Sequence, residues 1–263
     1  MKKDTVTLNV DTRGVAIVKL NRPEVHNAFD GPLVSDLTNI LVDLGKDIKI
    51  RVIILAANGA SFCAGADIKW MKKMGISSKE ENLKDASDVG NLLVTLDSLP
   101  KPTISLIQGN AFGGGVGLIA ATDIAIAVDS VNFAISEVRV GVIPSVISPF
   151  VINAIGQRYS GRYFLTGERF NALDALRIGL IHDVVHKDHL LERAEKFVQK
   201  ILEGAPNAQL EAKKLVKFSR EKTINKAMIN ELSKRIARIR VSDEAQEGLE
   251  AFSQKRKPNW IIH

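Results

Sequence analysis

Three consecutive glycines, Gly113–Gly115, are the residues of this sequence best placed to do chemistry, because apolar segments flank them on both sides. The run Thr103–Ile107 predicts a short buried strand before them, and Val116–Ala121 predicts the start of a helix after them. A helix N-terminus leaves backbone N–H groups unpaired and carries the positive end of the helix dipole. We therefore expect this junction to bind a phosphate, a carboxylate or a developing oxyanion. Taken alone, the segment fits a turn that only serves close packing equally well, since it lacks the P-loop and dinucleotide-binding patterns.

A second junction of the same kind lies upstream. Residues Arg51–Ala57 predict another buried strand, and Ser61–Lys69 lead through small residues into a helical pattern. Two such junctions can direct two backbone amides at one oxygen atom. Together they would stabilise negative charge that develops on a carbonyl oxygen.

The elements that must position these junctions follow from the periodicity. From residue 1 to about residue 195, short apolar strands alternate with helical patterns, which predicts an α/β fold of ββα units with stacked sheets. After residue 195 the pattern is helical, in the segments Lys196–Glu203, Ala208–Ser219, Ile224–Arg240 and Asp243–Phe252. The apolar positions of these helices exceed what so small a helical unit can bury by itself. We therefore divide the chain into residues 1–195 and 196–263.

Four motifs occur in order along the chain: Val18–Ala28, Phe62–Ile68, Gly109–Gly117 and Phe133–Pro144. Together they resemble the motifs of the crotonase, or enoyl-CoA hydratase/isomerase, superfamily, and the likeness continues to Ala251–Arg256. The resemblance implies that residues 1–195 form a crotonase-like spiral of ββα units with the CoA and active sites. It also implies that residues 196–263 form a helical domain that drives assembly into a homotrimer or a dimer of trimers.

The same resemblance assigns roles residue by residue. It gives the two oxyanion-binding amides to the backbone of Ala66 and Gly114, and a catalytic carboxylate to Glu137. It places Ala64 where the family recognises adenine through the backbone, and Lys255 where a neighbouring subunit's CoA is reached. The residues that it places at CoA are Arg22, Glu24, Val25, Ala64, Ala66, Asp67, Ile68, Gly114, Phe252 and Lys255. We interpret Asp67 as a structural carboxylate at a helix N-terminus.

The usual hydratase of this family has two glutamates, and this chain has one of them. Glu137 matches the second, whereas Gly117 takes the place of the first. Apolar neighbours such as Phe133, Ile135 and Val138 suggest that the carboxylate has a purpose. Hydration needs a base for the water and an acid for the α carbon. Two enzyme interpretations remain: Glu137 alone moves the protons of hydration, or it shuttles one proton in an enoyl-CoA isomerase.

The segment Ser136–Phe150 favours the hydratase. It lacks the glycine-rich stretch of general hydratases, and together with Gly117 it resembles bacterial methylglutaconyl-CoA hydratases of leucine breakdown. Such an acyl group carries a free carboxylate, which needs a cation or several hydrogen-bond donors. Arg139 is the nearest cation in the sequence. On a strand it would share a face with Glu137, so we favour an ion pair between the two.

The composition excludes several other kinds of site and argues against a membrane protein. The single cysteine, Cys63, excludes intrachain disulfides and cysteine-based metal clusters, and its apolar neighbours favour a packing role. None of the five histidines has a metal-ligand spacing with nearby carboxylates. No apolar run approaches the roughly 20 residues of a membrane span. We expect a cytoplasmic protein that needs no metal and no cofactor, with coenzyme A as part of its substrate.

The formal charge of +6 keeps one alternative of another class open. Basic residues are frequent in Lys213–Arg240, as they would be in a non-catalytic RNA-binding or scaffold protein on the same fold. Acidic residues, namely Glu211, Glu221 and Glu231, adjoin or interrupt this run. We therefore favour a solvated helical face and do not expect nucleic acid as a partner.

Overall fold

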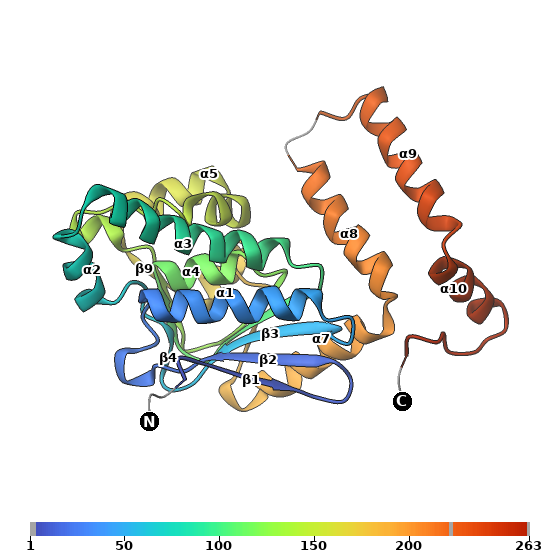
Figure 1. The fold of residues 1–263 in the computed structure, drawn as a ribbon, viewed down its shortest axis with the longest axis horizontal. Helices are drawn as coiled ribbons and strands as arrows, with labels where there is room; N and C mark the ends of the chain where they lie inside the picture. The colour runs from blue at the N-terminus through green and yellow to red at the C-terminus, as the bar shows by residue number, and fades with distance from the viewer. Residues whose placement is uncertain (1–3, 221–222, 262–263) are drawn as a thin grey trace.

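Between residues 52 and 134, successive strands of the chain alternate between two sheets, whose arrangement can be followed in Figure 1. The computed structural model describes residues 4–220 and 223–261. In the larger sheet, of order β1-β2-β3-β5-β7-β10, β1 and β2 are antiparallel and the other neighbours are parallel. Its strands are β1 (Val6–Val10), β2 (Val15–Leu20), β3 (Val52–Ala57), β5 (Thr103–Ile107), β7 (Ile124–Val128) and β10 (Asp183–Val185). The smaller sheet consists, in spatial order, of β4 (Ser61–Cys63), β6 (Asn110–Phe112), β8 (Asn132–Ala134) and β9 (Arg169–Asn171).

The structure confirms the predicted ββα repeat. The pairs β3–β4, β5–β6 and β7–β8 each send their first strand to the larger sheet and their second to the smaller sheet. The helices that follow these pairs are α2 (Ile68–Gly75) with α3 (Lys79–Ser98), α4 (Gly114–Ala120), and the 3-10 helix η2 (Glu137–Val140) with α5 (Ser148–Thr166). Strands β4, β6 and β8 are parallel neighbours, so their carboxyl ends lie at one edge of the smaller sheet. The segments after these three strands are therefore brought together.

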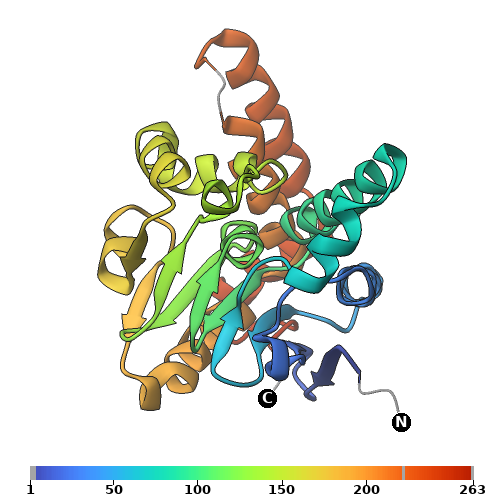
Figure 2. The same cartoon turned by 90° about the vertical axis from the view of Figure 1, so that its left-hand side faces the viewer.

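The core lies around the central strands of the larger sheet. All five residues of β5 are buried, and β3 and β7 are buried over most of their length, as expected for strands covered on both faces. Helix α1 (Gly31–Lys46) packs along α3, and Figure 2 shows the strands in the centre of the molecule beneath α3 and α5. Short elements complete this part of the chain, namely η1 (Pro23–Val25), α6 (Ala172–Arg177) and η3 (Lys187–His189).

Helix α7 (Leu190–Glu203) belongs with the sheets by its packing. It contacts β3, β5 and β7, and it buries Ala194, Val198 and Ile201. The predicted division after residue 195 falls inside this helix. The helices that lie apart from the sheets begin only after Gly204, the C-cap of α7.

Three helices form an arm that projects from the sheets: α8 (Pro206–Ser219), α9 (Lys226–Arg240) and α10 (Asp243–Ser253) (Figure 1). The predicted helical segments match them to within two residues at each end. Lys213 of α8 binds Asp123 at 2.7 Å, and Lys217 binds Asp97, so α8 is tethered to the body of the protein. No residue of α8 or α9 is buried within the described chain. Across residues 4–220 and 223–261, no helix combines the length and the apolar character that crossing a bilayer requires.

Candidate active site

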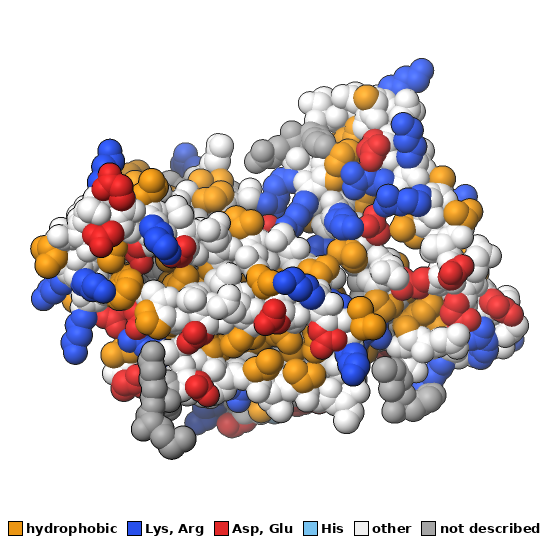
Figure 3. All heavy atoms as spheres, in the orientation of Figure 1, with side chains coloured by type: hydrophobic (Ala, Val, Ile, Leu, Met, Phe, Trp, Pro, Cys, Tyr) orange, Lys and Arg blue, Asp and Glu red, His pale blue; other side chains and the backbone are white. Residues whose placement is uncertain are grey.

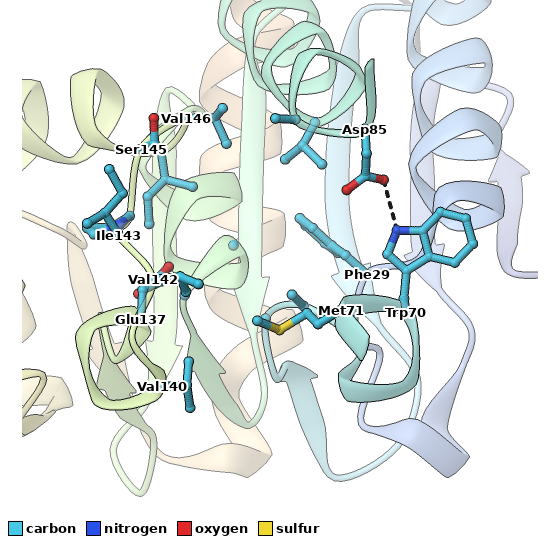
Figure 4. A pocket seen from close by; sticks show the side chains of 18 of the residues that line it. Phe29, Trp70, Met71, Asp85, Glu137, Val140, Val142, Ile143, Ser145 and Val146 are labelled. Atoms are coloured by element: carbon cyan, nitrogen blue, oxygen red, sulfur yellow. Dashed lines mark hydrogen bonds between the residues drawn. The ribbon is translucent and has the colours of Figure 1, made fainter. Parts of the chain in front are cut away.

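A cavity of about 440 Å³ opens where the segments after β4, β6 and β8 meet. Figure 4 shows Glu137 and Val140 on one side of it and Trp70 and Asp85 on the other. Most of the lining is apolar, which suits the hydrocarbon part of a ligand. The lining residues that bear on the chemistry are Ala64, Gly65, Ala66, Ile68, Gly113, Gly114, Glu137, Asp85 and Ile147.

The backbone at Ala66 is held in place by hydrogen bonds of the residues before and after it. Phe29 N donates to Gly65 O at 2.7 Å, and Asp67 N donates to Phe29 O at 2.8 Å, as in a parallel β-bridge between Phe29 and Ala66. In such a bridge the bonded groups belong to the flanking residues, so the N–H of Ala66 points away from Phe29. Within the described chain this N–H has no hydrogen-bond partner. It is a fixed and available donor at the cavity.

Gly114 supplies a second donor of the same kind. It is the first residue of α4, and the preceding Gly113 has φ +47°, a conformation that L side chains rarely adopt. Gly113 N donates to Ala134 O at 2.9 Å, while Gly113 O accepts from Val116 N and Gly117 N. The N–H of Gly114 has no hydrogen-bond partner among the described residues, and it lies at the positive end of the helix dipole.

Phe29 is the common neighbour of both amides. Besides its bridge to Ala66, its ring packs on Gly114, where a Cβ would lie 2.8 Å from Phe29 Cε2. A side chain at Gly114 would therefore press on the residue that positions Ala66. This contact explains why glycine occupies the position of the second donor.

Glu137 places a carboxylate in the cavity beside the glycine turn that carries Gly114. It starts η2, and its Oε1 lies against Gly113, where a Cβ would be only 2.9 Å away. Its Oε2 is buried and has no hydrogen-bond partner in the described structure. Burial raises the pKa of this carboxyl, although a hydrogen bond from its own backbone lowers it in part. A carboxyl with a raised pKa and a free oxygen in a cavity is suited to taking up and returning a proton.

The expected ion pair between Arg139 and Glu137 is wrong. Residues Glu137–Val140 form a 3-10 helix rather than a strand, and two residues apart on such a helix point about 120° apart. Arg139 packs its side chain over Gly167, where it lies in the field of Glu168. No ion pair links it to Glu137 in the described chain.

The position of the absent glutamate is filled by hydrocarbon. Gly117 is buried in α4, and a Cβ there would lie 2.5 Å from Ile147 Cγ2 and 3.6 Å from Leu93 Cδ1. Ile147 also lines the cavity. A methyl group thus stands beside the place where the usual hydratase has its first carboxylate.

Arg22, one of the residues predicted to lie at CoA, has a clear structural role. Arg22 donates to Ala28 O at 2.6 Å and binds Asp30 at 2.9 Å and Asp67 at 3.1 Å. Its guanidinium therefore joins the loop after β2 to the start of α2. Two neighbouring predicted contacts in η1 differ in burial, since Glu24 is exposed and Val25 is half-buried.

Asp67 is the N-cap of α2, as predicted. Its Oδ1 accepts from Lys69 N at 2.8 Å and from Trp70 N at 3.2 Å. It is buried behind the loop and does not line the cavity, whereas Ala64 and Ile68 do.

Phe252 and Lys255 lie far from this cavity within one chain. Phe252 is on α10, where it is 85% exposed, and Lys255 is exposed just beyond that helix. Figure 1 shows α10 at the opposite end of the molecule from α2. Their predicted contact with CoA therefore depends on a neighbouring subunit.

Three residues that matter at the site were missed or left open by the sequence. Asn27 is fully buried at φ +55°, and its amide donates to Asn58 O and Ser61 O, each at 2.9 Å. Asparagine's tolerance of left-handed backbone was a usable signal. Trp70, whose sequence pattern fits core packing as well as a place at the cavity, lines the cavity and donates its indole N–H to Asp85 at 2.8 Å. Asp85 gave no signal, because it stands in a polar helical stretch.

Cys63 is buried as predicted, and burial raises the pKa of its thiol to about 12. Such a thiol stays protonated and packs rather than reacts.

Several basic residues of the arm are engaged with acids. Beyond the two tethers of α8, Glu211 binds Lys214 at 2.8 Å and Arg238 at 2.7 Å, and Arg235 binds Glu231 at 2.9 Å. Figure 3 shows basic, acidic and apolar side chains mixed over this region. Glu221 and Lys222, part of the same run, lie outside the described residues.

Comparisons with known proteins agree with this geometry. The sequence model of the family described as enoyl-CoA hydratase/isomerase matches residues 11–261. The chain is 32% identical to (E)-benzylidenesuccinyl-CoA hydratase of Thauera aromatica, over 96% of this chain and 97% of that protein. It is also 32% identical to an enoyl-CoA isomerase/hydratase of Mycosarcoma maydis, over 95% and 93% of the two chains. The structure of an enoyl-CoA hydratase from Shewanella pealeana superposes with a TM-score of 0.94 at 43% identity, over 97% of this chain and 96% of that one.

Proposed function

The chain belongs to the enoyl-CoA hydratase/isomerase family, and we propose that it adds water to the α,β double bond of an enoyl-CoA thioester with Glu137 as its one acid–base group. The observation that carries this proposal is the free, buried Oε2 of Glu137 in the same cavity as the available amides of Ala66 and Gly114. The family implies an acyl-CoA substrate. The proposal requires no metal and no cofactor besides the CoA of that substrate.

The two amides stabilise the charge that hydration creates. When the oxygen of water bonds to the β carbon, the π electrons move toward the thioester oxygen, which becomes an enolate. N–H donors at Ala66 and Gly114 would bind that oxygen, and one such donor is worth roughly 2.7–4 kcal/mol in known oxyanion holes. Glu137 takes the proton that the water loses and then returns a proton to the α carbon, so that H and OH are added in balance.

Isomerisation is the second candidate, and the contact of Ile147 with Gly117 favours it. In that reaction the carboxylate of Glu137 removes a proton from the α carbon of a 3-enoyl thioester and returns it to the γ carbon, which moves the double bond to the α,β position. One carboxylate is sufficient, and the same two amides hold the dienolate oxygen. The name of the Mycosarcoma maydis relative combines both activities.

We propose an uncharged acyl group. Among the described residues that line the cavity, none is Lys, Arg or His. Asp30 is paired with Arg22, so Asp85 and Glu137 are the carboxylates that an acyl group would meet. The resemblance of Ser136–Phe150 supports methylglutaconyl-CoA, but its free carboxylate would find no cation among the described residues that line the cavity. That unpaired charge would be costly to desolvate.

Assembly into a trimer, or a dimer of trimers, is part of the proposal. The arm leaves apolar side chains exposed, among them Val216, Ile229, Ile236, Leu249 and Phe252. Unpaired apolar surface of this extent is typical of a subunit interface. A neighbouring arm would bring Phe252 and Lys255 to the CoA of this chain. A cytoplasmic location, which fits the unpaired thiol of Cys63, also remains a proposal.

The test is turnover of 2-enoyl- and 3-enoyl-CoA thioesters in water labelled with oxygen-18. Hydration predicts labelled oxygen in a 3-hydroxyacyl product from the 2-enoyl substrates. Isomerisation predicts conversion of the 3-enoyl substrates without label. Glutaconyl and methylglutaconyl thioesters belong in the same panel, and a preference for them would contradict the uncharged acyl group. Failure to turn over any member would contradict the proposed function.

A further inference from the structure

We propose that the hydrogen-bonded pair Trp70–Asp85 is the end wall of the acyl cavity and sets the longest acyl chain that the enzyme accepts. This inference rests on the proposed function. The pair joins two helices, since Trp70 belongs to α2 and Asp85 to α3. Trp70 Nε1 donates to Asp85 Oδ1 at 2.8 Å, as Figure 4 shows.

The pair separates two cavities. Trp70, Asp85 and Val34 line both the cavity that holds Glu137 and a second cavity of about 630 Å³ between α1, α2 and α3. The indole and the carboxylate therefore stand at the partition. Removing either side chain would join the two spaces.

The indole is held in place from several sides. Gly31, at the start of α1, leaves room for it, since a Cβ there would lie 2.8 Å from the ring. Lys73 places its Nζ 4.7 Å from the ring centre, and it lines the second cavity. With the hydrogen bond to Asp85, these contacts fix the ring against α1, α2 and α3. A side chain fixed in this way forms a wall rather than a flexible rim.

The two sides of the partition differ in chemistry. On the side of Glu137 the lining includes Met71, Val89, Val142 and Ile143. On the other side most of the lining residues are polar or charged, as in Ser35, Thr38, Asn39, Lys73, Glu81, Lys84, Asp88 and Asn91, although apolar atoms supply more of the lining surface. An alkyl chain gains by filling the first space and meets the indole at its end. Without the indole it would pass into the second cavity.

The experiment measures kcat/KM for 2-enoyl-CoA thioesters from crotonyl to dodecenoyl in wild type and variants. Trp70→Ala and Asp85→Ala should shift the preferred substrate to longer chains, with a change of about tenfold or more in the ratio of long to short substrates. Asp85→Asn keeps an oxygen that accepts from the indole, so it should keep the wild-type length preference, whatever its rate. Asp36→Ala is the matched control, because this exposed carboxylate of α1 lines neither cavity.

The outcomes separate this inference from the proposed function. If wild type turns over none of the thioesters, the proposed function fails. If wild type is active and both alanine variants keep its length profile, the wall is refuted while the function stands. If Trp70→Ala does not fold, the Asp85 variants decide the matter. An equal shift in Asp85→Asn and Asp85→Ala would contradict a wall that depends on the hydrogen bond.

Discussion

Ile147 occupies the space that a side chain at Gly117 would need. A Cβ on Gly117 would lie 2.5 Å from Ile147 Cγ2, and both residues are buried. The absent glutamate is therefore replaced by a packed hydrocarbon contact rather than by another polar group. The chemistry of the cavity is left to Glu137.

Restoring the carboxylate tests this contact. We expect Gly117→Glu alone to destabilise the protein by about 1–3 kcal/mol or more, because it overpacks the site and buries a charge. Combining it with Ile147→Ala removes the clashing methyl groups and should recover much of that loss. Urea unfolding of both variants and of Ile147→Ala alone gives the comparison. A Gly117→Glu variant as stable as wild type would show that Ile147 does not fill the space beside Gly117.

The donor role of Gly114 is tested by two substitutions that differ in the N–H. Gly114→Ala keeps the amide, whereas Gly114→Pro removes it at the first helical position, where proline is compatible with a helix. Both add a Cβ that presses on Phe29, so their comparison isolates the donor. We expect kcat of the proline variant to be about 10²–10³-fold below that of the alanine variant. Equal rates in the two variants would rule out Gly114 as a donor.

The raised pKa of Glu137 predicts a cost in stability. Burial raises the pKa of Glu137 in the folded state above its ordinary value of 4.5. Between pH 4.5 and this raised pKa, the native state therefore binds more protons than the unfolded state. Stability then falls as pH rises through the folded-state pKa. Glu137→Gln should therefore be more stable than wild type near neutral pH, and this difference should vanish below about pH 4.5. Unfolding free energies measured across this range check the sign, and a Gln variant that is less stable at neutral pH contradicts it.

The arm predicts assembly. We expect wild type to sediment as a trimer or a multiple of it at micromolar concentration, because Ile229 and Ile236 lie seven residues apart on one face of α9 and are half exposed. The double variant Ile229→Glu with Ile236→Glu should dissociate. Ile48→Glu, an equally apolar and more exposed position outside the arm, should not. A stable wild-type monomer would refute the assembly and the reach of Lys255.

Local patterns in the sequence carried the prediction of the elements. Thr103–Ile107 is a strand with those bounds, since a run of buried apolar residues fixes it without knowledge of its partners. Asp67 was recognised as a helix cap because an aspartate before a helical pattern satisfies its first N–H groups. The helices of the arm followed from their 3.6-residue period.

Contacts between distant segments lay beyond local patterns. Gly117 and Ile147 meet through the packing of α4 against the start of α5, which no periodicity encodes. Trp70 and Asp85 meet only because α2 folds back on α3. Arg139 points away from Glu137 for a related reason, since the sequence predicts the alternation of a strand for residues that turn in a 3-10 helix.

In the proposed mechanism, Glu137 moves the protons while the amides of Ala66 and Gly114 hold the thioester oxygen. The most direct measurement is kcat together with the binding of a CoA thioester for wild type, Glu137→Gln and the control Glu80→Gln, an exposed glutamate of α3. We expect Glu137→Gln to lose about 10²–10⁴-fold in kcat while it still binds the thioester, and the control to keep its activity. A Glu137→Gln variant that keeps most of the wild-type kcat would show that Glu137 does not move the protons.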